Sequence, residues 1–171
     1  MYKGYSYVSQ KGIMKIEDYP YVAKDGKCKF TKKKTMFKNV GMVQEKALTN
    51  EQLKALILRQ PVGVGIVTNG NFKFFKNGVM TEEYLKCSDP KTSVNHGVAV
   101  VGFGKTVVGE VANKVCSEYW IVRNTWGSNW GDQGFFKLCM DGTGKEPTPY
   151  GTCQINRFPT YPTMEKKKAP R

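Results

Sequence analysis

Long apolar runs and histidine are scarce in this sequence of 171 residues. No apolar stretch approaches the roughly 18 residues that a membrane-spanning helix needs, so no membrane span is predicted. The N-terminus, Met1-Tyr2-Lys3-Gly4-Tyr5, lacks the apolar core of a signal peptide, so we expect no targeting signal in this chain. No cysteine pair has CxxC spacing, and the single histidine, His96, lies away from the five cysteines in sequence. We therefore predict neither a metal site nor a cofactor.

The composition is that of a folded, basic protein. Hydrophobic residues make up 40% of the chain and aromatic residues 12%, which is typical of one domain with a real core. The formal net charge of +13 is spread over Lys32-Lys33-Lys34, a lysine-rich tail at 166–168 and many single lysines. Lysine dominates over arginine and no nucleic-acid motif is present, so we interpret this charge as a solvated surface and do not predict a nucleic-acid partner.

Apolar periodicity and turn residues predict both helices and strands up to residue 97 and almost only strands after it. We expect a helix that stops at Gly12, a capped helix over 51–59 with Thr49 and Gln52 as its capping box, and a short aromatic turn of helix over 71–76. Short strands separated by Gly, Asn and Asp favour an α+β fold with an antiparallel sheet curling toward a barrel. The predicted strands are 36–44, 62–67, 98–103, 107–111, 117–123, 134–139 and 155–161.

Two polar residues stand at the ends of apolar runs. His96 directly precedes the run Val98–Gly104, and Asn124 directly follows the run Tyr119–Arg123. Strand ends hold side chains on rigid backbone, and an imidazole oriented by an amide is the supporting half of a thiol nucleophile's machinery. No cysteine of the chain has the sequence context of that nucleophile.

Further motifs are distributed along the chain in a fixed order. They are Glu17-Asp18-Tyr19-Pro20-Tyr21, Asp25-Gly26-Lys27-Cys28, Gln60-Pro61-Val62, Gly78-Val79, Asn95-His96-Gly97 with Val101-Gly102-Phe103-Gly104, Tyr119-Trp120-Ile121-Val122, Asn124-Thr125-Trp126-Gly127 with Trp130-Gly131 and Gly134-Phe135-Phe136, and Tyr161-Pro162. In this order they resemble the papain family of cysteine peptidases, including the cathepsins, and the resemblance covers nearly all of residues 2 to 162.

The resemblance implies roles for several residues. His96 is similar to the catalytic histidine and Asn124 to the residue that orients it, while Trp126 would cover their hydrogen bond and Trp130 would support the site. It also implies a disulfide between Cys87 and Cys153, whereas a pairing of Cys116 with Cys139 is left open. By the same resemblance, a pocket for the substrate residue two before the scissile bond is lined by Gly65, Val94, Gly97 and Phe158, and an apolar guest is expected there.

One part of the family pattern is missing from this sequence. The family carries its nucleophile on a Gln-…-Cys-Gly-Ser-Cys-Trp segment, with the glutamine in the oxyanion hole, and no such segment occurs here. Cys28 instead resembles a structural cysteine whose disulfide partner lies upstream, so we reject it as nucleophile. The resemblance thus implies a remnant of the helical lobe over 1–30, a β-barrel lobe over 31–162 and a basic tail over 163–171.

Three functions fit these observations. The first is the C-terminal portion of a papain-like cysteine endopeptidase that acts on a peptide or protein substrate when the nucleophile lobe is supplied. The second is an inactive pseudoprotease that serves as a binding or structural subunit, and the third is a basic binding module on a barrel scaffold. In each case a missing lobe or a partner chain is expected over the cleft face, because a large exposed apolar patch invites association. The resemblance implies a lysosomal or vacuolar location, or secretion.

Overall fold

A computed structural model describes residues 1–87, 89, 91–106, 116–140 and 150–164. The strand predicted over 107–111 and all but the first two residues of the basic tail lie outside these residues. The chain forms two compact units, which we describe separately: a terminal unit of Met1–Val43 with Tyr161–Arg171, and a central unit of Gln44–Thr160. These units divide the chain after residues 43 and 160, whereas the lobes expected from the sequence divide it after residues 30 and 162.

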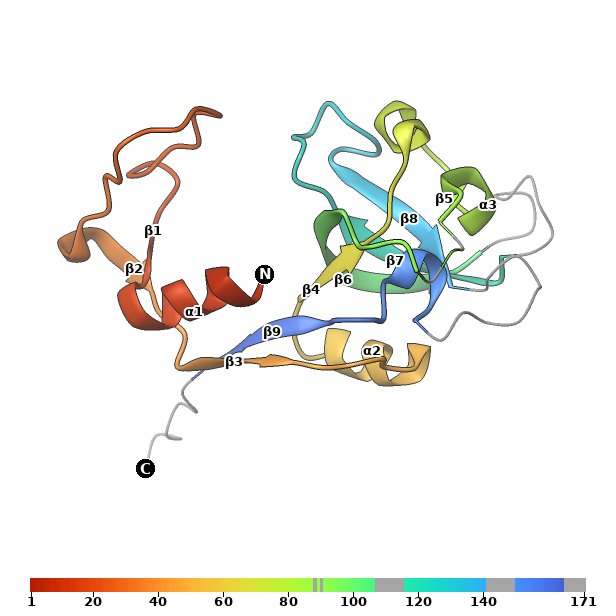
Figure 1. The fold of residues 1–171 in the computed structure, drawn as a ribbon, viewed down its shortest axis with the longest axis horizontal. Coiled ribbons are helices and arrows are strands. Elements are labelled where there is room, and N and C mark those ends of the chain that lie inside the picture. The colour runs from red at the N-terminus through yellow and green to blue at the C-terminus, as the bar shows by residue number, and fades with distance from the viewer. Residues whose placement is uncertain (88, 90, 107–115, 141–149, 165–171) are drawn as a thin grey trace. The chain divides into compact units, whose positions relative to one another are not determined.

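The central unit is built on a sheet that is mainly antiparallel (Figure 1). Strand β6 pairs antiparallel with β4 on one side and with β7 on the other, and β7 pairs antiparallel with β8. The short edge strand β5 is parallel to β8, and Thr160, at the start of β9, pairs with Gly63 of β4. The strands are β4 (Val62–Ile66), β5 (Val79–Met80), β6 (His96–Lys105), β7 (Glu118–Arg123), β8 (Phe135–Cys139) and β9 (Thr160–Thr163).

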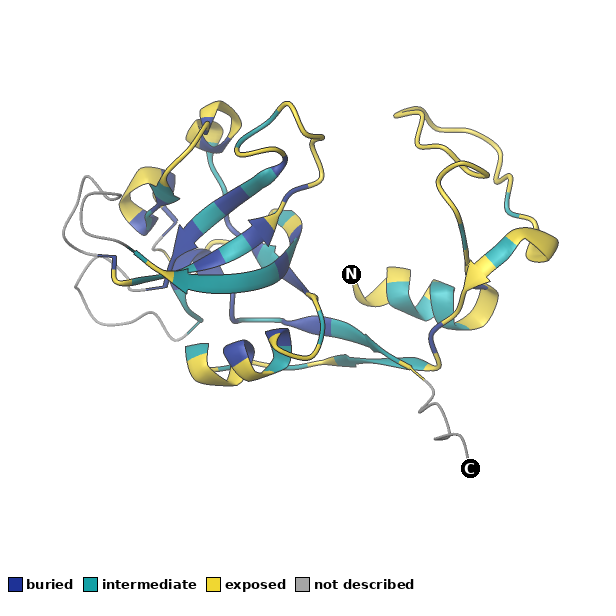
Figure 2. Ribbon diagram, turned by 180° about the vertical axis from the view of Figure 1, so that it is seen from behind, coloured by how far each residue is buried: buried dark blue, intermediate teal, exposed yellow. Residues whose placement is uncertain are grey.

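The hydrophobic core lies on this sheet, where Figure 2 shows buried residues concentrated in the strands. Valine and isoleucine fill β4 because β-branched side chains pack well on a pleated surface. The largest side chains that are fully buried come from strands β4 to β8 and from the segments that flank or join them: Trp120, Phe72, Phe136, Leu53, Ile66, Met80, Leu85, Leu138, Ile155, Val62, Val64 and Val100.

Short helices join the strands of the central unit. Helix α2 (Asn50–Ile57) begins at the predicted capping box: the Gln52 N–H donates to the Thr49 hydroxyl over 3.2 Å, and the Thr49 N–H donates to the Gln52 side chain over 2.9 Å. The aromatic turn expected over 71–76 is the 3-10 helix η2 (Gly70–Phe74). Two further short helices, α3 (Glu82–Leu85) and η3 (Thr152–Gln154), were not predicted.

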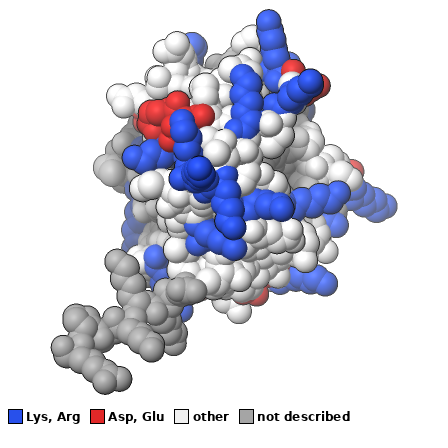
Figure 3. All heavy atoms as spheres, turned by 90° about the vertical axis from the view of Figure 1, so that its left-hand side faces the viewer, with Lys and Arg blue, Asp and Glu red and all other residues white. Residues whose placement is uncertain are grey.

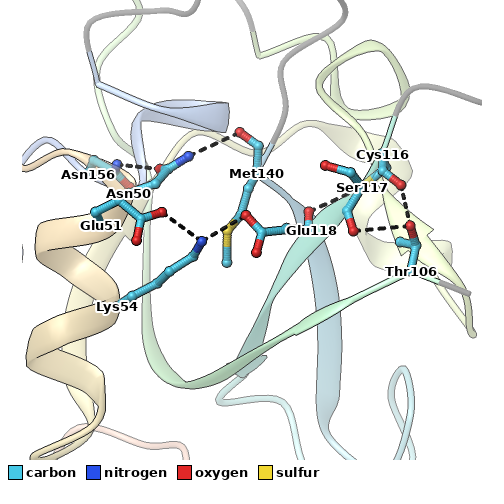
Figure 4. A network of polar contacts seen from close by, with 9 residues as sticks. All are labelled: Asn50, Glu51, Lys54, Thr106, Cys116, Ser117, Glu118, Met140 and Asn156. Carbon is cyan, nitrogen blue, oxygen red and sulfur yellow. Dashed lines mark hydrogen bonds and ion pairs between the residues drawn. The ribbon is translucent and has the colours of Figure 1, made fainter.

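Helix α2 is tied to β7 by an ion pair that is mostly shielded from solvent (Figure 4). The Lys54 ammonium lies 2.7 Å from Glu118 and 2.9 Å from Glu51, and only 11% of the Lys54 side chain is exposed. The hydrogen bond that Lys54 donates to Glu118, followed by the one that it donates to Glu51, raises the pKa of Lys54 above its ordinary value. Because α2 also packs against β6, this pair fixes the helix over the sheet.

Two disulfides close loops in the central unit. Cys87 and Cys153 are bonded as predicted, with Cα atoms 4.9 Å apart. Cys116 and Cys139, whose pairing the sequence left open, are also bonded, with a Cα separation of 5.7 Å. Both separations fall in the range of about 4.4–6.8 Å that is usual for disulfides. Cys28 is the only free cysteine, and it is exposed.

The terminal unit contains one helix and short strands. Helix α1 (Tyr2–Lys11) ends at Gly12, as predicted, and strand β1 (Ile13–Met14) pairs antiparallel with β2 (Thr35–Phe37). Strand β3 (Gly41–Gln44) and the 3-10 helix η1 (Lys32–Lys34) complete it. No apolar side chain of residues 1–43 is buried.

Two predicted strands are wrong in their extent. The strand expected over 36–44 is broken into β2 and β3, because the buried Asn39 side chain donates to the Gly41 carbonyl over 2.5 Å and so turns the backbone. The strand expected over 155–161 begins only at Thr160. Ile155, the first residue of the predicted strand, instead ends the 3-10 helix η3 with helical φ and ψ angles of −56° and −30°.

No helix among the described residues is long and apolar enough to cross a membrane. Within the same part of the chain, no group of three or more His, Cys, Asp and Glu side chains could hold a metal ion.

Candidate active site

The sheet brings His96 and Asn124 to one edge of the central unit. His96 is the first residue of β6, where it pairs with Ile66 of β4, and Asn124 directly follows the last residue of β7. Because β6 and β7 are antiparallel, with Ala99 opposite Arg123, the start of one strand lies beside the end of the other. The sheet topology therefore joins two residues that are distant in sequence.

A hydrogen bond links the two side chains. The His96 Nε2 atom lies 2.8 Å from the Asn124 Oδ1 atom, as the sequence predicted. The Thr125 N–H donates to the same Oδ1 over 2.8 Å, which identifies this atom as the amide oxygen because only the oxygen accepts. Nε2 must then donate, so a neutral ring carries its lone pair on Nδ1. No hydrogen-bond partner of Nδ1 occurs among the described residues.

Asn124 is held in place by its surroundings. It is buried, with 7% of its surface exposed, and its N–H donates to the Gly134 carbonyl over 2.9 Å. A buried amide oxygen that accepts two hydrogen bonds leaves the imidazole little freedom to rotate. The Asn124 Nδ2 atom is also buried, and it has no hydrogen-bond partner in the described part of the chain.

Aromatic rings surround the imidazole. The Trp126 ring centroid lies 5.2 Å from that of His96, as the sequence predicted, and Trp126 is 42% exposed. Trp130 stands 5.3 Å from Trp126, and its indole N–H donates to the Lys73 carbonyl over 3.2 Å. His96, Trp126 and Trp130 thus belong to one cluster of contacting rings.

Phe72 of η2 was not predicted as a site residue. Its ring centroid lies 5.4 Å from that of His96, 5.2 Å from Trp126 and 4.9 Å from Trp130, and it is fully buried. The three aromatic residues of the segment 72–75 were the available signal, but the sequence does not show which ring faces the imidazole. The buried Phe72 ring is thus the one against which His96, Trp126 and Trp130 all pack.

Two glycines shape the loop that carries the tryptophans. Gly127 and Gly131 have φ angles of 82° and 61°, a region that glycine enters at little cost. A Cβ atom on Gly131 would lie 2.6 Å from the Phe135 carbonyl oxygen, whereas one on Gly127 would meet nothing within 4 Å. Close backbone approach therefore requires glycine at 131, and backbone conformation alone favours it at 127.

The four predicted pocket residues come partly together. Gly65 pairs with Gly97 across β4 and β6, and a Cβ atom on Gly65 would lie 3.3 Å from the Val94 side chain. Phe158 is half-buried and lies two residues before Thr160, which pairs with Gly63, two residues before Gly65. Three of the residues are thus direct neighbours, and Phe158 approaches through the neighbouring strand pair.

The free thiol and the imidazole belong to different compact units. Four of the five cysteines are bonded in disulfides within the central unit, which excludes them as thiolates. Cys28 belongs to the terminal unit and keeps its thiol. The site of the central unit therefore has a histidine and an orienting amide, and no free thiol of its own.

The fold is that of papain-like proteins. Residues 1–163 match the family described as "Papain family cysteine protease". The chain belongs to this family, and its helices with a mainly antiparallel sheet confirm the predicted α+β, papain-like fold class.

Two relatives are similar in sequence to almost the whole of this chain. Vignain of Phaseolus vulgaris is 34% identical over 173 aligned residues, which include 99% of this chain and 43% of vignain. Cysteine proteinase 2 of Entamoeba histolytica is 34% identical over 160 residues, which include 93% of this chain and 45% of that protein. The chain thus spans less than half the length of these relatives.

A solved structure of a protease has a similar fold. Bromelain from Ananas comosus, in complex with the E64 inhibitor, superposes with a TM-score of 0.76 at 28% sequence identity. The match covers 96% of this chain and 69% of the bromelain chain.

Proposed function

We propose that this chain is the C-terminal portion of a papain-like cysteine endopeptidase and supplies the base of its active site. The observation that carries the proposal is the 2.8 Å contact between His96 Nε2 and Asn124 Oδ1, which presents Nδ1 as the proton acceptor. The nucleophilic cysteine and the oxyanion glutamine would come from a lobe outside this sequence. A remnant of the helical lobe over 1–30 and a β-barrel lobe over 31–162 fit this proposal, with a basic tail over 163–171.

The geometry supports a proton-transfer role for His96. A thiol placed beside Nδ1 would transfer its proton to that atom, and the imidazolium would stabilise the thiolate. Asn124 would hold the protonated ring by accepting from Nε2 without adding a charge. Trp126, Trp130 and Phe72 pack around the pair and keep water from part of it.

The orientation of the imidazole can be tested directly, because His96 is the only histidine. Nitrogen-15 NMR of the labelled chain should show one imidazole, with the proton of the neutral ring on Nε2. In the variant Asn124→Ala this preference should weaken. A neutral ring with its proton on Nδ1 would contradict the proposed base.

The activity requires a second component in the test. The chain alone should not hydrolyse peptides, because a base without its nucleophile has nothing to activate. Refolding it with the polypeptide of vignain that precedes the matched region should produce thiol-dependent hydrolysis. The variant His96→Ala should lower that rate by about a thousandfold or more. Hydrolysis by the chain alone would refute the proposal, and an inactive but stable mixture would favour the pseudoprotease.

The pocket of Gly65, Val94, Gly97 and Phe158 is proposed to take an apolar side chain of the substrate. Two glycines open its walls, and Arg157 already places a guanidinium 5.1 Å from the Phe158 ring centroid. A second cation would meet this charge and lose its own water. Matched substrates with leucine or arginine two residues before the scissile bond test this proposal, and preference for arginine would show that the pocket is wrongly placed.

We further propose that the protein works in an oxidising or lytic compartment, such as a vacuole or lysosome, or outside the cell. Its two disulfides support this, because disulfides persist mainly in oxidising environments. Detection of both bonds as oxidised in protein isolated from its natural source would test the proposal, and reduced thiols there would contradict it.

A further inference from the structure

The terminal unit exposes an apolar surface that its own chain does not cover. Every residue from Lys15 to Lys29 is exposed, including Ile16 at 68% and Tyr21 at 87%. Among residues 1–43 only Gly12 and Asn39 are buried, so the unit has no hydrophobic core of its own. Contiguous exposed apolar surface of this kind marks an interaction site in soluble proteins.

Part of this surface is a groove of about 510 Å³. The Tyr7 and Phe30 rings meet edge to face on it, with centroids 6.2 Å apart, and the Lys29 N–H donates to the Tyr19 hydroxyl over 3.1 Å. We call it the terminal groove. Its lining comes from α1, β1 and the segment that follows them: Tyr7, Gly12, Ile13, Met14, Ile16, Tyr19, Tyr21, Cys28 and Phe30.

The charge around the terminal groove is strongly positive. Eight lysines and three acidic residues lie between residues 11 and 34, and all eight lysines are exposed. Within the described part of the terminal unit, Lys34 with Asp18 forms the only ion pair. Figure 3, which views the side on which Figure 1 shows α1, β1 and β2, shows lysine and arginine side chains spread over that face. An occupant that carries carboxylates would therefore be attracted and correctly oriented.

We propose that the terminal groove binds an acidic, amphipathic polypeptide segment, whose apolar side chains fill the groove and whose carboxylates meet the surrounding lysines. This inference rests on the proposed function, because the segment would belong to the polypeptide that completes the peptidase. It concerns residues of the terminal unit, whereas the histidine site is built from residues of the central unit.

Charge and shape favour this occupant over two others. A second copy of the chain would bring another +13 of net charge to a basic face, and this repulsion opposes self-association. An anionic lipid surface would match the charge, but a concave groove receives side chains of a partner better than it enters a bilayer. Apolar anchors in a groove with a charged rim are the usual pattern of peptide recognition by proteins.

The inference can be tested by selecting displayed peptides that bind the intact chain. The rate at which Cys28 is labelled then reports whether a bound peptide covers the groove. Cys28 lines the groove and is the only free thiol, so a maleimide reagent should label this residue alone. Selection from a random library should enrich peptides that combine Leu, Ile or Phe with Asp or Glu. These peptides should slow the labelling of Cys28 at least about tenfold at saturation, and added salt should weaken their binding.

Variants separate the apolar contribution from the charged one. Ile16→Lys should abolish binding of the acidic peptides, and Lys27→Glu with Lys29→Glu should weaken it about tenfold. Lys46→Glu with Lys91→Glu makes the same charge change in the central unit and should leave binding unaltered. Circular dichroism of each variant should match the parent chain, because all five positions are exposed.

Several outcomes would overturn the inference. They are no enrichment, enrichment of basic or uncharged peptides, and peptides that bind without protecting Cys28. Concentration-dependent dimers that protect Cys28 would identify a second copy as the occupant, and protection by phosphatidylserine vesicles would identify a membrane. His96→Ala should leave peptide binding unchanged, so loss of hydrolysis in the refolded mixture and loss of peptide binding report on separate claims.

Discussion

At the scale of single residues, the close approach of the backbone at Gly131 predicts a large loss of stability when this glycine is replaced. Gly131→Ala would place a methyl group 2.6 Å from the Phe135 carbonyl oxygen, at a positive φ. Gly127→Ala incurs only the backbone cost, about 1–2 kcal/mol of the free energy of unfolding. Urea denaturation should therefore show a clearly larger loss for Gly131→Ala. Equal losses would mean that the loop relaxes and that the close approach is unimportant.

The buried carboxyl of Glu82 is expected to make the free energy of unfolding depend on pH. Burial raises the pKa of its carboxyl above the ordinary 4.5, although a hydrogen bond from the Cys153 backbone acts in the opposite direction. The folded protein therefore holds this proton to higher pH than the unfolded chain does. Its contribution to stability is fully present below the unfolded pKa and is lost as pH rises through the folded pKa.

The variant Glu82→Gln should remove this pH-dependent loss. Free energies of unfolding measured across the acid range should fall less steeply with rising pH in Glu82→Gln than in the parent chain. The neighbouring Glu83 is exposed, so Glu83→Gln serves as a matched control and should follow the parent curve. A parallel shift of both variants would contradict the assignment to Glu82.

The site illustrates what single residues reveal from sequence. His96 and Asn124 stand at the ends of apolar runs, and the resemblance of their flanking motifs to the papain family predicted their contact. Phe72 could not be identified in this way, since its contact with the imidazole depends on how η2 turns over the sheet. Whether His96 acts as a base stays a prediction.

At the scale of elements, the capping box of α2 is expected to contribute measurable stability. Thr49→Ala removes the acceptor of the Gln52 N–H and should cost about 1 kcal/mol of the free energy of unfolding. Thr49→Ser keeps an acceptor oxygen and should cost much less. Thermal or urea unfolding of the two variants makes the comparison, and an equal loss would mean that the methyl group matters more than the cap.

Elements were predictable where a local signal marks their ends. Helix α2 begins at a capping box and α1 ends before Gly12, and both signals are visible in the sequence. Helix α3 ends instead at Lys86 in the left-handed conformation, a position that sequence patterns assign to glycine. Strands β1 and β5 have two residues each, which is too short for a periodic pattern.

At the scale of the whole molecule, the disulfides should differ in their contribution to stability. Removing Cys87–Cys153, whose residues are 66 apart, should cost about 4 kcal/mol by loop closure. Removing Cys116–Cys139, whose residues are 23 apart, should cost about 3 kcal/mol. Urea denaturation of the two double alanine variants would measure both losses, and the reverse order would show that packing around the sulfurs dominates.

The fold class was predictable because collinear motifs cover almost the whole chain, but the division into compact units was not. Sequence patterns show where strands and turns lie, whereas the units depend on pairing between residues at opposite ends of the chain. The Val40 N–H, for example, donates to the Thr163 carbonyl over 2.9 Å within the terminal unit. No local pattern at either residue announces this pairing.

This pairing also determines the order in which parts of the chain can fold during synthesis. A ribosome makes Val40 early and Thr163 only after the entire central unit, so β3 emerges without the strand that will pair with it. Until then the nascent chain carries an open strand edge, which is prone to join other chains. Strands β4, β6, β7 and β8 all precede residue 140, so they can begin to pair while synthesis continues, but β3 stays without its partner until β9 has emerged.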